Sequence, residues 1–243
     1  MAILFLVVNA LYGVFAGLIL PLFGKAGLIN YTVSRGYYYL GGFFTGLTCT
    51  VKGEENIMST PAVYVCNHQS SLDVMLMGKV YPKNTAVVAK KELKYYPFLG
   101  WFMMLNNSVF LDRKNRQNAV NSAKQAADDI RKKNISIWLF PEGTRGHSST
   151  VDLLPFKKGA FHMAVQARVP IVPVVIANYS QLYSTKDKRF LSGNVKIEVL
   201  PPVMTADLDD SSATIDKLTN QVRDAMLTSL KEISPPVVVK KSE

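Results

Sequence analysis

Cysteine is scarce in this sequence: Cys49 and Cys66 are the only two among 243 residues. Two thiols supply neither a disulfide framework nor the spaced ligand pairs of a cysteine-bound metal site. Cys66 also ends an apolar run, which predicts a buried thiol. A disulfide-stabilised secreted scaffold is therefore excluded, and the main domain suits a reducing compartment.

Charge is nearly absent from the first 51 residues, where Lys25 and Arg35 are the only charged side chains. Residues 1–24 are uncharged, mostly apolar and long enough to cross a bilayer. Residues 36–51 form a shorter uncharged stretch, rich in Tyr and Phe, that could lie at the interface or return as a short helix. The start is not basic and no clear A-x-A cleavage site follows, so a retained anchor is favoured over a secretory signal. We therefore expect residues 1–51 to form an N-terminal membrane anchor of one or two hydrophobic helices.

Acidic residues are also few: 18 Asp and Glu stand against 28 Lys and Arg, a formal net charge of +10. This balance suits nucleic acid, anionic lipid headgroups or a phosphate-rich substrate, and charge alone does not choose among them. The sequence has no internal repeat and no low-complexity region. We expect one domain over residues 52–234 and a flexible tail at 235–243. Lysines that could attract an anionic leaflet precede the centre of this domain: Lys79, Lys83, Lys90, Lys91 and Lys94.

Beyond residue 52, short apolar runs alternate with amphipathic stretches. The alternation favours an α/β fold, a mostly parallel sheet flanked by helices, preceded by the N-terminal membrane-embedded helical segment. The uncharged aromatic stretch 95–105 is interpreted as a surface that dips into lipid or as a substrate wall, with ordinary core as the alternative. Strands are expected at 62–66, 85–89, 109–111, 135–140, 171–177 and 195–200, and helices at 71–80, 115–133, 156–168 and 212–233. Ligands of such sheets bind beyond the carboxyl ends of the strands.

The segment NHQSSLD, residues 67–73, follows the first of these strands directly. His68 on the loop and Asp73 in the first helical turn can come within hydrogen-bond reach, which leaves the other ring nitrogen free to take a proton. These two residues correspond to the general base and the orienting carboxylate of a catalytic triad, whose third member, the nucleophile, is not part of the segment. The structural alternative is a capping box of Ser70 and Asp73, and HxxxxD alone is a pattern that chance supplies often.

Two more charged clusters follow apolar strands. FPEGTR, residues 140–145, contains a glycine that lets backbone approach a ligand, Glu142 that could receive a glycerol hydroxyl or fix an arginine, and Arg145 that could grip a phosphate. VFLDR, residues 109–113, ends in Arg113, a second candidate phosphate ligand, and Lys157 and Lys158 add positive charge nearby. The alternative for FPEGTR is a strand-end turn with a surface ion pair. Three such clusters could converge on one edge of the sheet.

Together these segments resemble the glycerolipid acyltransferase family, specifically its 1-acyl-glycerol-3-phosphate acyltransferases. NHQSSLD, VFLDR, FPEGTR and VPIVPV at 169–174 occur in the family's order and approximate spacing, over roughly residues 50–205. An upstream NHxxxxD paired with FPEGTR is a highly specific combination. The resemblance implies that an acyl group passes from acyl-CoA to the sn-2 hydroxyl of lysophosphatidic acid, forming phosphatidic acid in phospholipid and triacylglycerol synthesis.

The resemblance also implies the residue roles and the partners. His68 would be the general base and Asp73 its orienting partner, with no metal and no cofactor beyond the co-substrate acyl-CoA. The expected partners are acyl-CoA, lysophosphatidic acid and membrane lipid, and not nucleic acid. Lys240 and Lys241 resemble a dilysine retrieval signal, which implies the endoplasmic reticulum membrane with the catalytic domain facing the cytosol. The acceptor would be held by Arg113, Glu142, Gly143, Thr144, Arg145 and Lys157.

Three alternatives remain open on the sequence. The acceptor could be glycerol-3-phosphate or another lysophospholipid. A hydrolase could use Ser70 or Ser71 as a nucleophile beside His68. A non-enzymatic basic module on nucleic acid or lipid would leave the HxxxxD and FPEGTR clusters unexplained. The other histidines are not expected to be catalytic, and the two tryptophans are interpreted as interface and core: His147, His162, Trp101 and Trp138.

Overall fold

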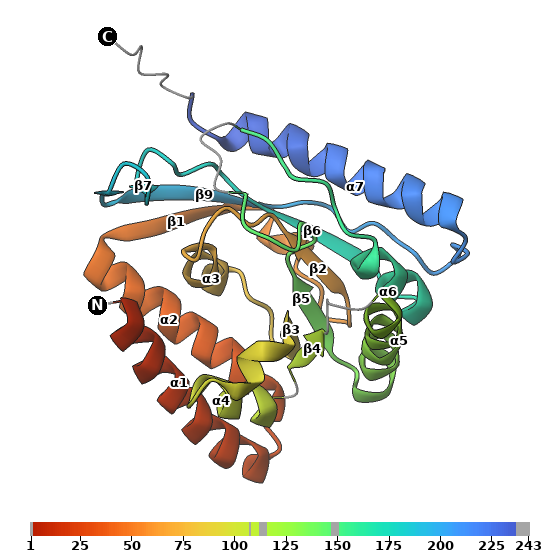
Figure 1. The fold of residues 1–243 in the computed structure, drawn as a ribbon, viewed down its shortest axis with the longest axis horizontal. Helices are drawn as coiled ribbons and strands as arrows, with labels where there is room; N and C mark the ends of the chain where they lie inside the picture. The colour runs from red at the N-terminus through yellow and green to blue at the C-terminus, as the bar shows by residue number, and fades with distance from the viewer. Residues whose placement is uncertain (1, 107, 112–115, 147–150, 237–243) are drawn as a thin grey trace.

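A seven-stranded sheet organises the part of the chain that the computed structural model describes, residues 2–106, 108–111, 116–146 and 151–236. The order across the sheet is β1-β9-β6-β2-β5-β3-β4 (Figure 1). Its strands are β1 (Leu47–Lys52), β2 (Val63–Cys66), β3 (Thr85–Lys90), β4 (Val109–Leu111), β5 (Ser136–Leu139), β6 (Ile171–Ile176) and β9 (Gly193–Val199). The run from β6 to β4 is parallel throughout, while β9 is antiparallel to β6 and parallel to β1. The predicted mostly parallel sheet is confirmed.

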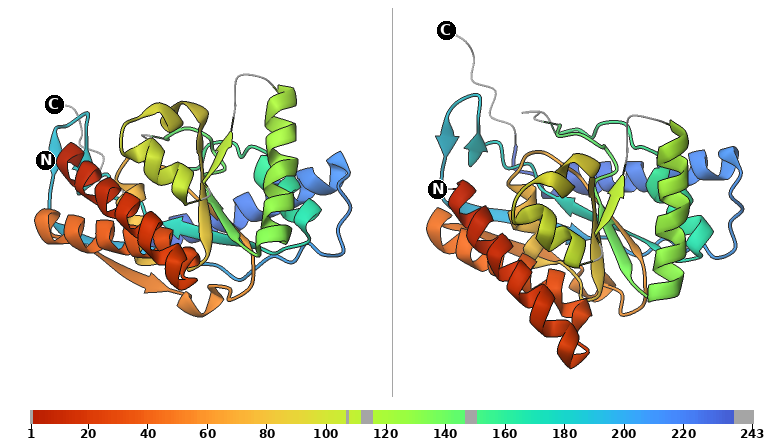
Figure 2. Two further views of the ribbon diagram at one scale, coloured as in Figure 1. Left: turned by 90° about the horizontal axis from the view of Figure 1, so that it is seen from below. Right: turned by 60° about the horizontal axis from the view of Figure 1, so that its bottom comes forward.

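Helices cover both faces of this sheet (Figures 1 and 2). One face carries α3 (Asp73–Leu76) and the N-terminal helices, and the other carries α5 (Arg116–Lys133), α6 (Gly159–Ala167) and α7 (Ser212–Ile233). The central strand β2 alternates between the two cores: Val63 and Val65 pack beneath α5 to α7, while Tyr64 and Cys66 pack beneath α3. A strand buried on both faces needs an uninterrupted apolar run, which is why the strands were visible in the sequence.

The N-terminal helices are α1 (Ala2–Ile19) and α2 (Ile29–Thr45), joined by the 3₁₀ turns Leu20–Phe23 and Ala26–Leu28. Helix α1 packs on α2 and on α4 (Leu99–Leu105), where the ring of Phe102 lies against Gly13. Helix α2 packs against α3 and the 3₁₀ turn Met77–Lys79 that follows it. Among the residues that the structure describes, no helix has the length and apolarity needed to cross a membrane.

The sheet begins earlier than the predicted domain boundary at residue 52. Uncharged residues 36–51 divide between the second half of α2 and the edge strand β1, where Leu47 is paired with Gly193 and Val51 with Ile197. The change falls at Gly46, whose φ of 68° ends the helix in the left-handed conformation. The expectation that this whole stretch belongs to the anchor is therefore corrected.

The remaining elements match the expected ones in kind and differ at their ends. The helix expected at 156–168 begins at Gly159, and the one expected at 71–80 is α3 followed by the 3₁₀ turn Met77–Lys79. Shorter elements were not predicted: helix α4, the hairpin of β7 (Tyr183–Ser184) and β8 (Arg189–Phe190), and the 3₁₀ turns Glu54–Asn56 and Lys91–Tyr95. The hairpin rises at the edge of the molecule near the start of α1 (Figure 2).

Candidate active site

The polar loops after β2 and β5 meet because these strands are neighbours in the sheet. Asn67 fixes the end of β2 to the end of β6: its amide donates to the Ile176 carbonyl over 2.9 Å, and its oxygen accepts the Ile176 N–H over 2.8 Å. The Gln69 side chain donates to the Ile176 and Ala177 carbonyls, each over 3.1 Å. The backbone on both sides of His68 is therefore held against a neighbouring strand.

His68 and Asp73 form the predicted pair. Asp73 is fully buried at the start of α3, and its Oδ2 lies 2.8 Å from Nδ1 of His68. The same oxygen accepts the backbone N–H groups of Gln69 (2.6 Å) and Ser70 (2.8 Å). A carboxylate oxygen accepts and does not donate, so Nδ1 of His68 carries the proton and Nε2 has the free lone pair. One half of the predicted capping box coexists with the pairing with His68, because the Asp73 carboxylate accepts from both the Ser70 N–H and His68. The other half is not formed, since the Ser70 hydroxyl accepts from the Leu72 N–H and not from the Asp73 N–H.

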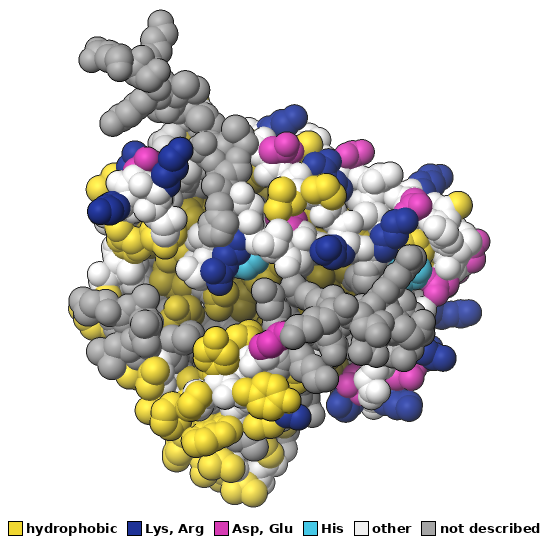
Figure 3. All heavy atoms as spheres, in the orientation of Figure 1, with side chains coloured by type: hydrophobic (Ala, Val, Ile, Leu, Met, Phe, Trp, Pro, Cys, Tyr) yellow, Lys and Arg dark blue, Asp and Glu magenta, His cyan; other side chains and the backbone are white. Residues whose placement is uncertain are grey.

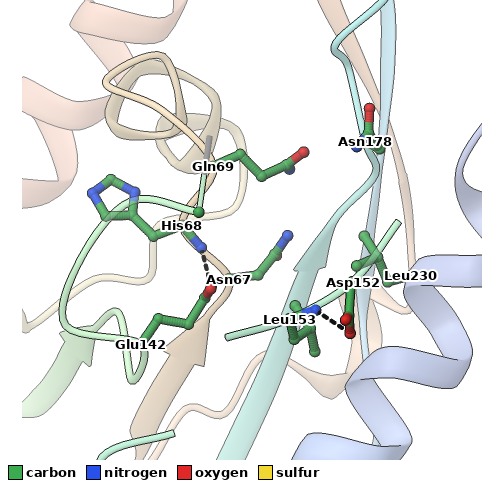
Figure 4. Close-up of a pocket in the computed structure, with 9 residues that line it drawn as sticks. Asn67, His68, Gln69, Glu142, Asp152, Leu153, Asn178 and Leu230 are labelled. Atoms are coloured by element: carbon green, nitrogen blue, oxygen red, sulfur yellow. Dashed lines mark hydrogen bonds between the residues drawn. The ribbon is translucent and has the colours of Figure 1, made fainter. Parts of the chain in front are cut away.

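The imidazole of His68 has a fixed orientation and an open side. Its ring stacks on Phe140 at a centroid distance of 4.0 Å and an interplanar angle of 18°. The side chain is 14% exposed, so solvent or a substrate reaches it at one edge. A cavity lies behind the His68 backbone, lined by Gln69, Asp152 and Asn178 among others, and the ring points away from it (Figure 4). A reacting alcohol must therefore approach from the ring side and not through this cavity.

Glu142 clamps the backbone of the catalytic loop. It is 5% exposed, and its Oε1 accepts the N–H of His68 over 2.7 Å (Figure 4). Its Oε2 accepts the N–H of Leu154 over 3.1 Å. In return Gly146 N–H donates to the His68 carbonyl over 2.8 Å. Burial raises the pKa of Glu142, and the two backbone N–H groups offset part of that rise. Both carboxylate oxygens are occupied by backbone, so the observed role of Glu142 is to hold His68.

The rest of the FPEGTR turn presents positive charge to solvent. Gly143 adopts a φ of 71°, and a Cβ there would lie 2.9 Å from Cε of Lys157. Lys157 donates its backbone N–H to the Pro141 carbonyl over 2.8 Å, which keeps the start of the next segment beside the turn. Thr144, Arg145 and Lys157 are exposed. Arg145 and Lys157 form no ion pair within the described residues.

The other residues singled out from the sequence lie away from this cluster or outside the residues that the structure describes. Arg113 follows β4, which is separated from β5 by β3, and it lies outside the described residues, as does His147. His162 sits on α6 with Nδ1 2.5 Å from Oδ1 of Asp210, and among the described residues it forms no hydrogen bond or ion pair with His68 or Asp73. Trp138 is fully buried and Trp101 is 52% exposed, as predicted. No group of three His, Cys, Asp or Glu side chains placed to hold a metal occurs in the described part of the chain.

Tyr179 completes the site, and the sequence analysis missed it. It lies three residues beyond β6 and is 4% exposed, and its hydroxyl donates to Oδ1 of Asp73 over 2.5 Å. Burial raises the pKa of Tyr179 well above its ordinary value, and the neighbouring Asp73 charge raises it further. The available signal was its place after a strand that ends at the same sheet edge as β2.

Comparisons with known proteins agree with this geometry. A family model described as acyltransferase matches residues 48–177, and this range contains His68, Asp73 and the FPEGTR turn. The chain therefore belongs to the acyltransferase family, and it is an enzyme of the transferase class. This class assignment excludes the non-enzymatic basic module.

Named relatives refine the assignment. The chain is 42% identical over 222 residues to the 1-acyl-sn-glycerol-3-phosphate acyltransferase of Saccharomyces cerevisiae, covering 91% of this chain and 73% of that one. It is 40% identical over 193 residues to the human 1-acyl-sn-glycerol-3-phosphate acyltransferase alpha, covering 79% of this chain and 67% of the human one. The crystal structure of the 1-acyl-sn-glycerophosphate (LPA) acyltransferase of Thermotoga maritima is similar at a TM-score of 0.66 and 25% identity, over 92% of this chain and 95% of that one.

Proposed function

We propose that this enzyme transfers a fatty acyl group from acyl-CoA to the sn-2 hydroxyl of lysophosphatidic acid, forming phosphatidic acid. The observation that carries the proposal is the 2.8 Å contact of His68 Nδ1 with the buried Asp73 carboxylate, which leaves Nε2 as the base on a side chain that is 14% exposed. The acceptor follows from the names of the yeast, human and bacterial relatives. Lysophosphatidic acid carries both the alcohol that a base needs and the phosphate that the exposed cations Arg145 and Lys157 would bind.

The chemistry is a direct displacement at the thioester. Nε2 of His68 accepts the sn-2 hydroxyl proton while the alcohol oxygen bonds to the thioester carbonyl carbon. The resulting tetrahedral oxyanion collapses, the carbon–sulfur bond breaks, and the imidazolium returns the proton to the CoA thiolate. Asp73 stabilises the imidazolium in between, because its charge lies against Nδ1. No proton is gained or lost over the cycle.

The surroundings of the serines support transfer without an acyl-enzyme. Ser70 is 8% exposed, and its hydroxyl lies 2.9 Å from the Tyr179 hydroxyl. It also accepts the Leu72 N–H over 3.0 Å. A nucleophilic serine must contact the base, whereas the Ser70 hydroxyl contacts Tyr179 and Leu72. Ser71 is exposed and, among the described residues, forms no hydrogen bond with His68, so neither serine has the contact that the hydrolase alternative needs.

Exposed cations beside the dyad suit the acceptor phosphate. Arg145 and Lys157 flank the turn that holds His68, and Arg145 offers a forked pair of donors to phosphate oxygens. Arg113 is proposed to join them from the end of β4. Another acceptor, either glycerol-3-phosphate or a lysophospholipid with a larger headgroup, is the second candidate, because the same cations would bind the phosphate monoester of the first or the phosphodiester of the second.

A membrane-associated location fits the surface. Hydrophobic side chains gather on the part of the face in Figure 3 where Figure 1 places α1 and α4. The exposed ones include Leu11, Phe15, Leu18, Leu22, Phe23, Phe43, Tyr95, Tyr96, Trp101 and Met104. A patch of this extent on a soluble protein marks an interaction surface, and aromatic residues favour the lipid–water interface. We propose that this face enters the endoplasmic reticulum membrane, with the site open to cytosolic acyl-CoA.

The test is an acyl-transfer assay with oleoyl-CoA and lysophosphatidic acid on purified wild type and His68→Ala. Loss of the base should lower the rate by about 10²- to 10⁴-fold. His162→Ala is the matched control, because His162 also pairs with an aspartate, at 2.5 Å, but on α6. The control should keep wild-type activity. Full activity in His68→Ala, or a clear preference of wild type for glycerol-3-phosphate, would contradict the proposal.

A further inference from the structure

Tyr179 holds the carboxylate of the catalytic pair from the side opposite His68. It lies in the segment after β6, outside the four segments on which the family resemblance rests, and packs in the core beneath α3. The three N–H donors to Asp73, from His68, Gln69 and Ser70, all contact Oδ2. Among the described residues, the Tyr179 hydroxyl is the one donor to Oδ1.

The direction of every hydrogen bond in this cluster can be assigned. Tyr179 has one O–H, and the ionised carboxylate only accepts, so that proton lies toward Oδ1 of Asp73. The Tyr179 oxygen must then accept the Ser70 hydroxyl proton over 2.9 Å. Ser70 in turn accepts the Leu72 N–H over 3.0 Å. The chain runs Leu72 to Ser70 to Tyr179 to Asp73, and each donor strengthens the next.

We propose that Tyr179 is a positioning residue for the acyl transfer, acting through Asp73 on His68. The proposal rests on the proposed function, in which His68 is the base. The terminal torsion of an aspartate side chain is broad, so a carboxylate held at one oxygen alone can rotate. A short charge-assisted bond at Oδ1 fixes that rotation and keeps Oδ2 directed at Nδ1 of His68. The raised pKa of Tyr179 keeps its hydroxyl protonated, and so a donor.

The test compares two tyrosine-to-phenylalanine variants that each remove one buried hydroxyl. Tyr179→Phe removes the donor to Asp73. Tyr81→Phe is the matched control, because the fully buried Tyr81 donates its hydroxyl to the Thr85 carbonyl over 3.0 Å, in the core beneath α3 but without contact to the catalytic pair. We expect Tyr179→Phe to lower kcat by about 10- to 100-fold while KM for lysophosphatidic acid stays within about threefold. Tyr81→Phe should lower the thermal midpoint comparably and leave kcat unchanged.

A spectroscopic measurement separates positioning from general loss of stability. The Nδ1 proton of His68, assigned in ¹⁵N-histidine-labelled protein by its absence in His68→Ala, should change its chemical shift in Tyr179→Phe and not in Tyr81→Phe. If Tyr179→Phe does not fold, Ser70→Ala carries the test: losing the donor to the Tyr179 oxygen should lower kcat by a few fold at constant KM.

The outcomes distinguish this inference from the proposed function. Wild-type kcat in a folded Tyr179→Phe, or in Ser70→Ala where that variant carries the test, would overturn the positioning role while His68→Ala remained inactive. An unchanged Nδ1 resonance in Tyr179→Phe would also overturn it. Full activity of His68→Ala would overturn the proposed function itself.

Discussion

At the scale of single residues, Glu142 shows a carboxylate used as a clamp inside an active site. Each of its oxygens accepts one backbone N–H, from His68 on one segment and Leu154 on another. Hydrogen bonds to an ionised acceptor are stronger than neutral ones, and this one ion joins the loop after β2 to the segment before α6. The position of the His68 backbone therefore depends on a buried charge two segments away in the sequence.

Glu142→Gln should separate the clamp from the chemistry. Glutamine has one acceptor oxygen, and its NH₂ group would face the second backbone N–H, leaving a buried donor unpaired. We expect a loss of about 1–3 kcal/mol in the free energy of unfolding, together with a lower kcat because the His68 backbone is released. Urea unfolding and the transfer assay measure the two effects. Glu55→Gln, at an exposed position, is the control and should change neither.

How far the sequence reveals such residues depends on their separation along the chain. His68 and Asp73 could be paired in advance because a strand-to-helix turn brings residues five apart into contact. Tyr179 is 106 residues from Asp73, and a single tyrosine after an apolar run carries no pattern. The motif placed Glu142 at a strand-end turn, but only the packing of Leu154 against that turn determines that its oxygens face inward to the backbone.

At the scale of elements, the sequence predicted where the strands lie in the chain better than it predicted their order and direction in the sheet. Strands β2 and β6 are apolar at every position because both faces are buried, so their existence could be predicted from the runs alone. The reversed direction of β9 relative to β6 could not, because an antiparallel edge strand has the same composition as a parallel one. The early strand β1 was hidden for a related reason: its uncharged residues continue those of α2.

The aromatic helix α4 is the element with the clearest surface role. The sequence left open whether residues 95–105 are core, substrate wall or lipid surface. The structure divides the segment: Met103 is 6% exposed, whereas Tyr96 and Trp101 are 58% and 52% exposed. Trp101 on α4 and Tyr96, three residues before it, are large aromatic rings exposed beside the apolar face of α1, which favours contact of this surface with lipid.

Replacing Tyr96 and Trp101 by serine should weaken membrane binding without unfolding the protein. Two half-exposed aromatic side chains that enter lipid contribute on the order of 1–2 kcal/mol each, so we expect a loss of affinity for lipid vesicles of roughly 30- to 900-fold. Flotation with vesicles containing phosphatidic acid measures it. Met204→Ser, which removes another exposed apolar side chain in the segment between β9 and α7, is the control. If the double variant floated with vesicles as well as Met204→Ser does, a lipid contact at Tyr96 and Trp101 would be contradicted.

At the scale of the whole molecule, the N-terminal helices and the catalytic pair form one packed unit. Helix α2 lies so close to the α3 region that a Cβ on Gly41 would be 2.4 Å from Sδ of Met75. A Cβ on Gly78 would be 2.1 Å from the Ser34 carbonyl oxygen. Asp73 is the first residue of α3, so the surface proposed to enter lipid is rigidly connected to the residue that orients His68.

Gly78→Ala tests whether this close packing sets the height of the site above the lipid surface. The added methyl group must push α2 away from the catalytic domain, and overpacking of this kind costs about 1–3 kcal/mol of stability. Gly159→Ala is the matched control, because a Cβ at that helical glycine meets nothing within 4 Å. Differential scanning calorimetry should show a lower thermal midpoint for Gly78→Ala alone.

The activity of Gly78→Ala should then depend on how the acceptor is presented. Long-chain lysophosphatidic acid in vesicles must be reached from a fixed height, so its turnover should fall when α2 moves. Short-chain lysophosphatidic acid dissolved below its micelle concentration can diffuse to Nε2 of His68, and its turnover should stay near that of Gly159→Ala. A larger loss on the vesicle substrate is therefore the signature of coupling between α2 and the catalytic pair, whereas equal losses on both substrates would mean that the methyl group had only damaged the fold around Asp73.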